Sequence, residues 1–442
     1  MPGLKSKLLD TAAFNLLETV GMKFFGVVSF AILVRLLPRS DIGLIAIVAG
    51  YLAILTPLSL SPHTVLFRDY EKMKGSLNEH VSSYLAFWAW RSVAIMAIST
   101  ALSIVLFYWT NNAVLSVYLV GASVVLNLNL LQGMIADVLY VSFHQRRITK
   151  ITLYTNLLML ASMGLLFFYP NVLWYLAILI AWNTATAAWW WAELRKRVAF
   201  KFQLPKDYLR NIWKSFSELS FWNHLNTSMM ELIYRADTVI LALFVSATAV
   251  GNYAIALTIG NAFVLIPRII QKSTTLGLSQ MEDKEKESEL VSTMLKNSAL
   301  LAIAQLAGFY FVGRWVIGIF TPTQVEEIFF LTLLIGFGVS LLNVIRPLVS
   351  LNFSKTSVKK SFLEAYLPAA AASMAFYFVF TKFFGVTGTG LANIASYALL
   401  SLLIVAFTLK TYSLKWKWGW WSDREKSLLK EFFDKVKKKL SR

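Results

Sequence analysis

Three basic side chains, Lys23, Arg235 and Arg314, fall near the middle of long apolar stretches of this 442-residue chain. A charged side chain deep in a membrane-spanning helix costs at least about 2.5 kcal/mol, which excludes lipid-facing positions for them. A water-filled cavity tolerates such cations and would bind an anionic group such as a phosphate or diphosphate. Arg91 joins this predicted cavity, although it is close enough to a helix end for its guanidinium to reach water. A purely structural ion network is the alternative.

Four acidic side chains, Glu18, Asp137, Glu231 and Asp237, also fall within apolar stretches. A carboxylate inside a membrane changes its protonation with its exposure, so these four are candidates for coupling transport to protons or sodium ions. Glu231 precedes Arg235 by four residues, which is the favourable order for an ion pair on one helix face. Such a pair can equally serve only to hold helices in register.

Two further arginines, Arg268 and Arg346, lie near the inner ends of predicted membrane spans. Both belong to the charged residues in or near apolar stretches that need a reason, but neither is included in the predicted site.

Several functions are disfavoured by what the sequence contains. It has no cysteine and only four scattered histidines, so we predict no metal site and no cofactor. The formal net charge of +18 comes from basic residues in short loops between apolar runs, where membrane orientation explains them, and no nucleic-acid partner is predicted. No glycine-rich phosphate loop followed by lysine occurs, so the chain is no ATP-driven pump by itself. A membrane glycosyltransferase or polymerase would need acidic residues on an outer loop, and only Glu326 and Glu327 qualify.

The composition indicates a membrane protein. Hydrophobic residues make up 57% of the chain against 15% charged, and the mean hydropathy is +0.60, which is more apolar surface than one soluble core can bury. A spanning helix needs roughly twenty mostly apolar residues. We therefore predict an all-α membrane protein with about twelve transmembrane helices. The predicted spans are residues 13–37, 42–66, 83–109, 113–140, 151–168, 172–191, 219–245, 249–270, 295–320, 328–349, 362–384 and 388–411.

Basic residues concentrate in every second connection between these spans. Under the positive-inside rule this alternation predicts that both the N-terminus and the C-terminus are cytoplasmic. Arg35 and Arg39 in the first outer turn and Lys382 near the last one are exceptions.

The two halves of the chain resemble each other at an offset of 208 residues. Nine identities occur in residues 14–52 at this offset, and they include Asn15 with Asn223 and Gly43 with Gly251. We predict a six-helix lobe at residues 1–192, a cytoplasmic linker at 193–216 and a second six-helix lobe at 217–411. Because each lobe has an even number of spans, the two should be related by a pseudo-two-fold axis along the membrane normal.

The C-terminal residues 412–442 form a different predicted element. Apolar residues recur there at helical spacing, lysines occupy the other positions, and four tryptophans precede them. This pattern is typical of a basic amphipathic helix that lies on anionic membrane lipids.

Two short segments resemble a known family. Residues 30–43 resemble the first hairpin of the polysaccharide transporter family, the O-antigen-type flippases of the multidrug/oligosaccharidyl-lipid/polysaccharide exporter superfamily. Residues 234–237 and 250–254 resemble its seventh and eighth helices. The resemblance implies two lobes that rock around a central cavity and move an undecaprenyl-diphosphate-linked oligosaccharide between leaflets. It implies a role for Arg235 and Asp237 in particular.

We therefore expect a flippase in the plasma membrane that works by alternating access and is no enzyme. Its expected partners are the lipid-linked oligosaccharide, anionic lipids and polysaccharide polymerase machinery. A cation-coupled multidrug exporter of the same superfamily is the main alternative, although cationic drugs would be repelled by the predicted cavity.

Overall fold

The computed structural model describes residues 4–55, 77–142, 144–198, 220–279 and 281–412, and these residues form helices and turns without a β-strand. The linker predicted at 193–216 lies largely outside the described residues. So do the second half of the predicted span 42–66 and all but the first residue of the amphipathic tail.

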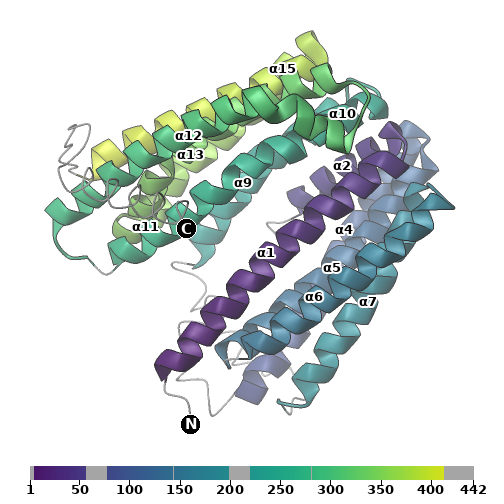
Figure 1. Cartoon of the computed structure of the whole chain (residues 1–442), viewed down its shortest axis with the longest axis horizontal. Helices are drawn as coiled ribbons and strands as arrows, with labels where there is room; N and C mark the ends of the chain where they lie inside the picture. Colours follow the sequence, from purple (N-terminus) through teal and green to yellow (C-terminus); the bar gives the residue numbers. More distant parts are fainter. Residues whose placement is uncertain (1–3, 56–76, 143, 199–219, 280, 413–442) are drawn as a thin grey trace, which may run out of the picture.

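The helices form two bundles (Figure 1). The first contains α1 (Leu4–Leu36), α2 (Arg39–Ile54), α4 (Leu77–Thr110), α5 (Ala113–Val141), α6 (Gln145–Ser162), the 3-10 turn η3 (Met163–Phe167) and α7 (Val172–Arg195). The second contains α9 (Ser220–Leu241), α10 (Ala247–Gly260), the 3-10 turn η4 (Asn261–Val264), α11 (Leu265–Ser279), α12 (Lys284–Phe320), α13 (Val325–Lys355), α14 (Val358–Ser361), the π turn η5 (Phe362–Tyr366) and α15 (Leu367–Thr411).

Each of the twelve predicted spans has a helical counterpart. Nine segments of the described chain are long and apolar enough to cross a membrane. One of them, Val358–Thr411, holds 54 residues and would be roughly 80 Å long as a straight helix, against a hydrocarbon core of about 30 Å. Gly385, with a φ of 56°, divides it into two spans. These nine segments thus account for ten of the twelve predicted spans. The counterparts of the remaining two spans are α2 and α9, the second of which carries several charged residues.

Some helices extend beyond the predicted spans. α12 begins at Lys284 rather than near residue 295, because Asp283 caps it by accepting the N–H of Glu285 at 2.9 Å. α4 begins at Leu77, six residues before its predicted span. The apolar stretch marks the part of a helix in lipid, whereas polar turns that continue the same helix carry no such signal.

The two bundles meet at one end and diverge toward the end where α1 begins (Figure 1). Across this junction α2 contacts α10 and α9, and α1 contacts α12. With cytoplasmic termini, as the charge alternation predicts, the junction would lie on the outer side and the arrangement would be open to the inside.

A symmetric pair of glycines makes the closest part of the junction. A methyl group at Gly43 of α2 would overlap the main-chain carbonyl of Ala247, and one at Gly251 of α10 would overlap that of Arg39. Gly43 and Gly251 are 208 residues apart, and so are Arg39 and Ala247. The offset found in the sequence therefore appears in space as a pseudo-two-fold contact.

We expect Gly43→Ala to weaken this contact by about 1–3 kcal/mol, the usual cost of overpacking, because a main-chain carbonyl has no rotamer to move aside. The measurement is the distance between spin labels at Val114→Cys and Phe330→Cys, one in each lobe, in a chain that has no native cysteine. The distance should lengthen as the lobes separate.

Gly26→Ala in α1 is the matched control, since nothing lies within 4 Å of a methyl group built there. It should leave the label distance unchanged. If the label distance is also unchanged in Gly43→Ala, the close contact between the two lobes at Gly43 does not exist in the membrane.

Two arginines that break the charge alternation also lie at the junction. Arg35 donates to the carbonyl oxygen of Ile319 at 2.5 Å, and Arg39 donates to the hydroxyl of Thr321. Both acceptors belong to the end of α12 in the other lobe. The structure therefore gives these exceptions to the positive-inside rule a reason: they bond the lobes together.

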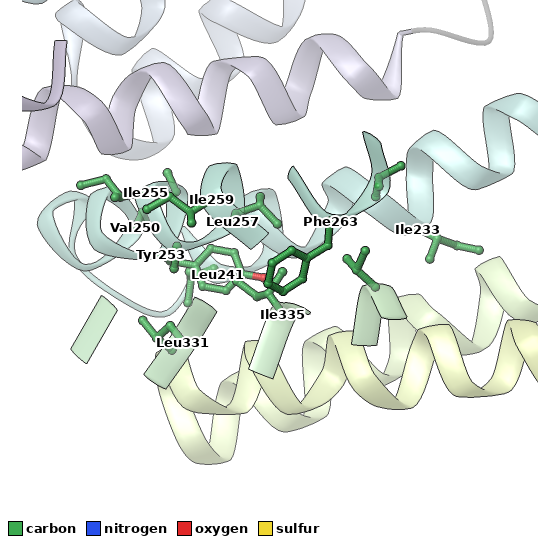
Figure 2. Close-up of a cluster of buried hydrophobic side chains, with 14 of the residues drawn as sticks. Ile233, Leu241, Val250, Tyr253, Ile255, Leu257, Ile259, Phe263, Leu331 and Ile335 are labelled. Carbon is green, nitrogen blue, oxygen red and sulfur yellow. The ribbon is translucent and has the colours of Figure 1, made fainter. Parts of the chain in front are cut away.

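The core of the second lobe lies between α10 and α13. Figure 2 shows Tyr253 and Phe263 among apolar side chains that include Leu331 and Ile335 of α13. Here the helix that was predicted as one span, 249–270, is interrupted by η4. Pro267 has no N–H to donate to the carbonyl of Phe263 four residues before it, and this carbonyl accepts the side-chain N–H of Asn343 at 2.9 Å. The packed core thereby fixes the orientation of Asn343.

Candidate functional site

A cavity of about 340 Å³ lies inside the second lobe, and we call it the arginine cavity. Side chains of α9, α11, α13, α14, η5 and α15 line it. Its charged lining residues are Arg268, Arg346 and Glu231, so the cavity carries an excess of positive charge. Amide and hydroxyl side chains, among them Asn223 and Ser350, make up much of the rest.

Arg346 is the buried cation of this cavity, with 8% of its surface exposed. Its Nε donates to the side-chain oxygen of Asn343 at 2.9 Å, and its Nη1 donates to that of Gln271 at 2.6 Å. Both partners are neutral, and no carboxylate among the described residues forms an ion pair with it. Because a buried charge without a counter-ion is costly, the site is arranged for an anion that arrives from outside.

Arg268 provides a second, exposed guanidinium on α11. Within the described part of the chain, no hydrogen bond or ion pair occupies it. Arginine binds phosphate oxygens with two parallel N–H donors, so a cavity with two arginines suits a phosphate or diphosphate group.

The predicted cations lie elsewhere. Lys23 and Arg235 are exposed on α1 and α9, and neither lines the arginine cavity. Arg314 does not line this cavity either, and its Nε lies 2.8 Å from a carboxylate oxygen of Glu326. Arg91 is buried with its guanidinium 5.8 Å from the ring centre of Phe87.

The expected ion pair between Glu231 and Arg235 is also wrong. Among the described ion pairs these two residues form none, and Glu231 faces the arginine cavity while Arg235 does not.

Two candidate carboxylates, Glu18 and Asp137, are half-buried in the first lobe. Glu18 accepts the side-chain N–H of Gln145 at 2.7 Å, which joins α1 to α6. Neither carboxylate lines the arginine cavity.

Asp237 is fully buried and is held by neutral donors. Its carboxylate accepts the hydroxyl of Tyr253 at 2.6 Å, the side-chain N–H of Asn393 at 3.2 Å and the main-chain N–H of Thr238 at 2.6 Å. No described ion pair includes it. A carboxylate in these surroundings is either protonated or balanced by a cation from solution.

The sequence prediction missed the two residues that line the cavity with cationic groups. Arg268 and Arg346 lie on different helices, near the inner ends of two predicted spans, and the predicted site included neither. The signal that was available is the spacing of Asn343 and Arg346, a polar residue three positions before an arginine inside an apolar span.

Comparison with known families supports this assignment of fold and class. Residues 32–329, more than half of the chain, match the family model described as "Polysaccharide biosynthesis protein". The chain belongs to this family. It is thus a multi-pass membrane protein of the polysaccharide transporter branch, as the resemblance of its hairpins predicted.

One curated relative of this family member is the probable flippase AglR of Haloferax volcanii. It is 29% identical over 181 residues, and the match covers 38% of the chain and 36% of the relative. The chain therefore matches little more than a third of that relative's length.

Solved structures share the fold of this family member. One is a multidrug resistance MATE family transporter of the MOP superfamily in an inward-facing conformation, with a TM-score of 0.69, 12% identity, and 89% of this chain and 96% of that one covered. Another is the lipid II flippase MurJ in an inward closed conformation, with a TM-score of 0.64, 13% identity, and coverage of 90% and 88%. At these identities the likeness concerns the fold alone, and it confirms the predicted exporter-superfamily fold.

Proposed function

We propose that this protein is a flippase that moves a lipid-linked oligosaccharide across the plasma membrane, with its diphosphate held by Arg268 and Arg346. The observation that carries the proposal is the buried Arg346, whose described partners are all neutral. A diphosphate supplies the missing negative charge, and its several oxygens can accept from both arginines.

The proposed cycle uses the two lobes as rigid units. In the inward-open arrangement the substrate diphosphate enters the arginine cavity of the second lobe. Separation of the outer junction and closure of the inner side then expose it to the other leaflet. The chain acts as a transporter and not as an enzyme, since no bond of the substrate needs to change.

A multidrug exporter is the runner-up because some solved structures of this fold are drug transporters. The cavity does not suit cationic drugs, since Arg268 and Arg346 together outweigh Glu231 and would repel them. An anionic or neutral drug would escape this objection, and competition with the diphosphate lipid tests it.

The proposal keeps the predicted division of the chain and its orientation. Both termini are cytoplasmic, residues 412–442 lie on anionic lipid, and polymerase machinery consumes the delivered oligosaccharide. Accessibility of single introduced cysteines to a membrane-impermeant reagent checks the orientation directly, because the chain has no cysteine of its own.

The test of the function is flipping of a fluorescent, diphosphate-linked oligosaccharide lipid in proteoliposomes, read as the fraction accessible to an impermeant quencher. The purified full chain should raise the accessible fraction well above that of empty vesicles. A chain that binds the lipid but never changes its accessibility would contradict the proposal.

Asp237→Asn is expected to remove any dependence of flipping on an imposed proton or sodium gradient. An amide still accepts from Tyr253 and Thr238, but it neither takes up a proton nor balances a cation. The ratio of the flipping rates with and without the gradient should fall to about one. Asp137→Asn in the first lobe is the control and should keep the parent ratio. If Asp237→Asn also keeps it, coupling does not pass through Asp237.

A further inference from the structure

A second cavity, of about 150 Å³, lies inside the first lobe between α1, α5, α6 and α7. In the repeat, α1 corresponds to α9 and α5 corresponds to α13. The helices α6 and α7 correspond to the two spans of the segment from α14 to α15. All of these elements of the second lobe contribute residues to the arginine cavity. Met22 lines the second cavity and Met230 lines the arginine cavity, and the two are 208 residues apart. The two lobes thus hold cavities at equivalent places.

The chemistry of the two cavities differs. Amides, threonines, methionines and two tryptophans surround the cavity of the first lobe, and none of its lining residues is charged. We call it the amide cavity. Because it lacks the cations of the arginine cavity, it offers a phosphate group no charge-assisted hydrogen bond from a cation.

Three amide side chains of this cavity are held in place by hydrogen bonds that they donate, while their side-chain oxygens accept none from the described residues. The side-chain N–H of Gln132 donates to the main-chain carbonyl of Asn183 at 3.0 Å. The side-chain N–H of Asn183 donates to the main-chain carbonyl of Leu179 at 2.8 Å, and that of Asn156 to the main-chain carbonyl of Thr152 at 2.7 Å. No donor of the described chain reaches the side-chain oxygens of Gln132, Asn156 or Asn183. A ligand with hydrogen-bond donors can bond to these oxygens, and sugar hydroxyls donate whereas ionised phosphate oxygens only accept.

Two tryptophans give the cavity an apolar wall. The indole N–H of Trp182 donates to the hydroxyl of Ser162 at 2.6 Å, which holds the ring in place, and Trp190 is buried with 4% of its surface exposed. A fixed aromatic wall beside a few oriented polar groups is the arrangement that binds a ligand with both C–H and hydroxyl faces.

We infer that the amide cavity binds the neutral sugar residues of the lipid-linked substrate, while the arginine cavity binds its diphosphate. This rests on the proposed function. The two halves of the repeat have then diverged in charge so that each lobe holds one chemical part of the same molecule.

The test measures binding of two probes to the full chain in lipid nanodiscs: a short-chain polyprenyl diphosphate, and the same lipid carrying a neutral disaccharide. Asn156→Leu and Asn183→Leu should each weaken binding of the sugar-bearing lipid about three- to tenfold and leave the sugar-free lipid within about twofold. Arg346→Gln should weaken both lipids equally. Each asparagine bonds a carbonyl of its own helix, and leucine is a good helix former, so the fold should tolerate both changes.

Methionine oxidation in the unmodified chain gives a second readout that needs no variant. The sugar-bearing lipid should protect Met22 and Met159 of the amide cavity, whereas either lipid should protect Met230 of the arginine cavity.

The outcomes separate the two proposals. If the parent binds neither lipid, the proposed function fails. Three results would overturn only the sugar site. The parent could bind both lipids equally tightly, the leucine variants could weaken both lipids to the same extent, or Met22 could oxidise equally fast with either lipid bound.

Discussion

Replacing Arg346 by glutamine is expected to slow flipping of the diphosphate-linked lipid between roughly 30-fold and several hundredfold, which is the effect of losing about 2–4 kcal/mol at a desolvated charge pair. Glutamine still reaches toward Asn343, but it carries no charge. The reason for the large effect is burial: a diphosphate oxygen facing Arg346 is shielded from water, so no solvent molecule replaces the guanidinium. The flipping assay in proteoliposomes measures this, with lipid binding measured in parallel.

Two further variants separate substrate binding from folding. Arg268→Gln removes the second cavity cation without breaking a described hydrogen bond, and it should also slow flipping, by less because Arg268 is exposed. Arg314→Gln is the matched control, since this arginine pairs with Glu326 away from the cavity. If Arg314→Gln slows flipping as much as Arg346→Gln, the cavity assignment is wrong.

Glu287→Ala is expected to lower the free energy of unfolding by about 3–5 kcal/mol, because it leaves Lys355 as a charge without its partner. Glu287 is buried, with a carboxylate oxygen 2.6 Å from the amine of Lys355, and its other oxygen accepts the hydroxyl of Tyr412. Burial raises the pKa of Tyr412 and the carboxylate adds to the rise, so the phenol keeps the proton that it donates. These contacts join α12, α13 and the end of α15. Unfolding in graded detergent mixtures measures the loss.

The exposed Glu289 on the same helix provides the control, and Glu289→Ala should change stability by no more than about 0.5 kcal/mol. The double variant Glu287→Met with Lys355→Met should recover much of the loss, because it removes both charges together. A double variant as unstable as Glu287→Ala would mean that packing, and not the ion pair, holds the three helices.

The helices followed from the sequence because lipid imposes one clear requirement, a long apolar stretch for every crossing. The repeat followed as well, since identities such as Gly43 with Gly251 reflect a contact that admits no side chain. The start of α12 at Lys284 was not predictable from apolar length, because its first turns are charged. The division at η4 was not predictable from apolar length either, although Pro267 just after it removes a helical hydrogen bond and is visible in the sequence.

The site was less predictable, for a physical reason. A cation in the middle of a span is conspicuous in a sequence, so Lys23, Arg235 and Arg314 were chosen. Whether a cation faces a cavity depends on helix rotation and on neighbours far away in the chain. The orientation of Arg346 depends on its hydrogen bond to Asn343, and that of Asn343 depends on its hydrogen bond to the carbonyl of Phe263. Only the folded lobe brings these three residues together.

The arginine bonds at the junction of the two lobes also bear on the energy balance of the proposed transport cycle. Arg35 and Arg39 donate there to uncharged oxygens of Ile319 and Thr321, and water replaces such partners when the junction parts. A hydrogen bond of a charged group contributes about 1.5–3 kcal/mol net. The two arginines together therefore stabilise the closed junction by a few kcal/mol relative to the state in which it has parted. A bound substrate must prefer the parted state by a similar amount to make that state predominate.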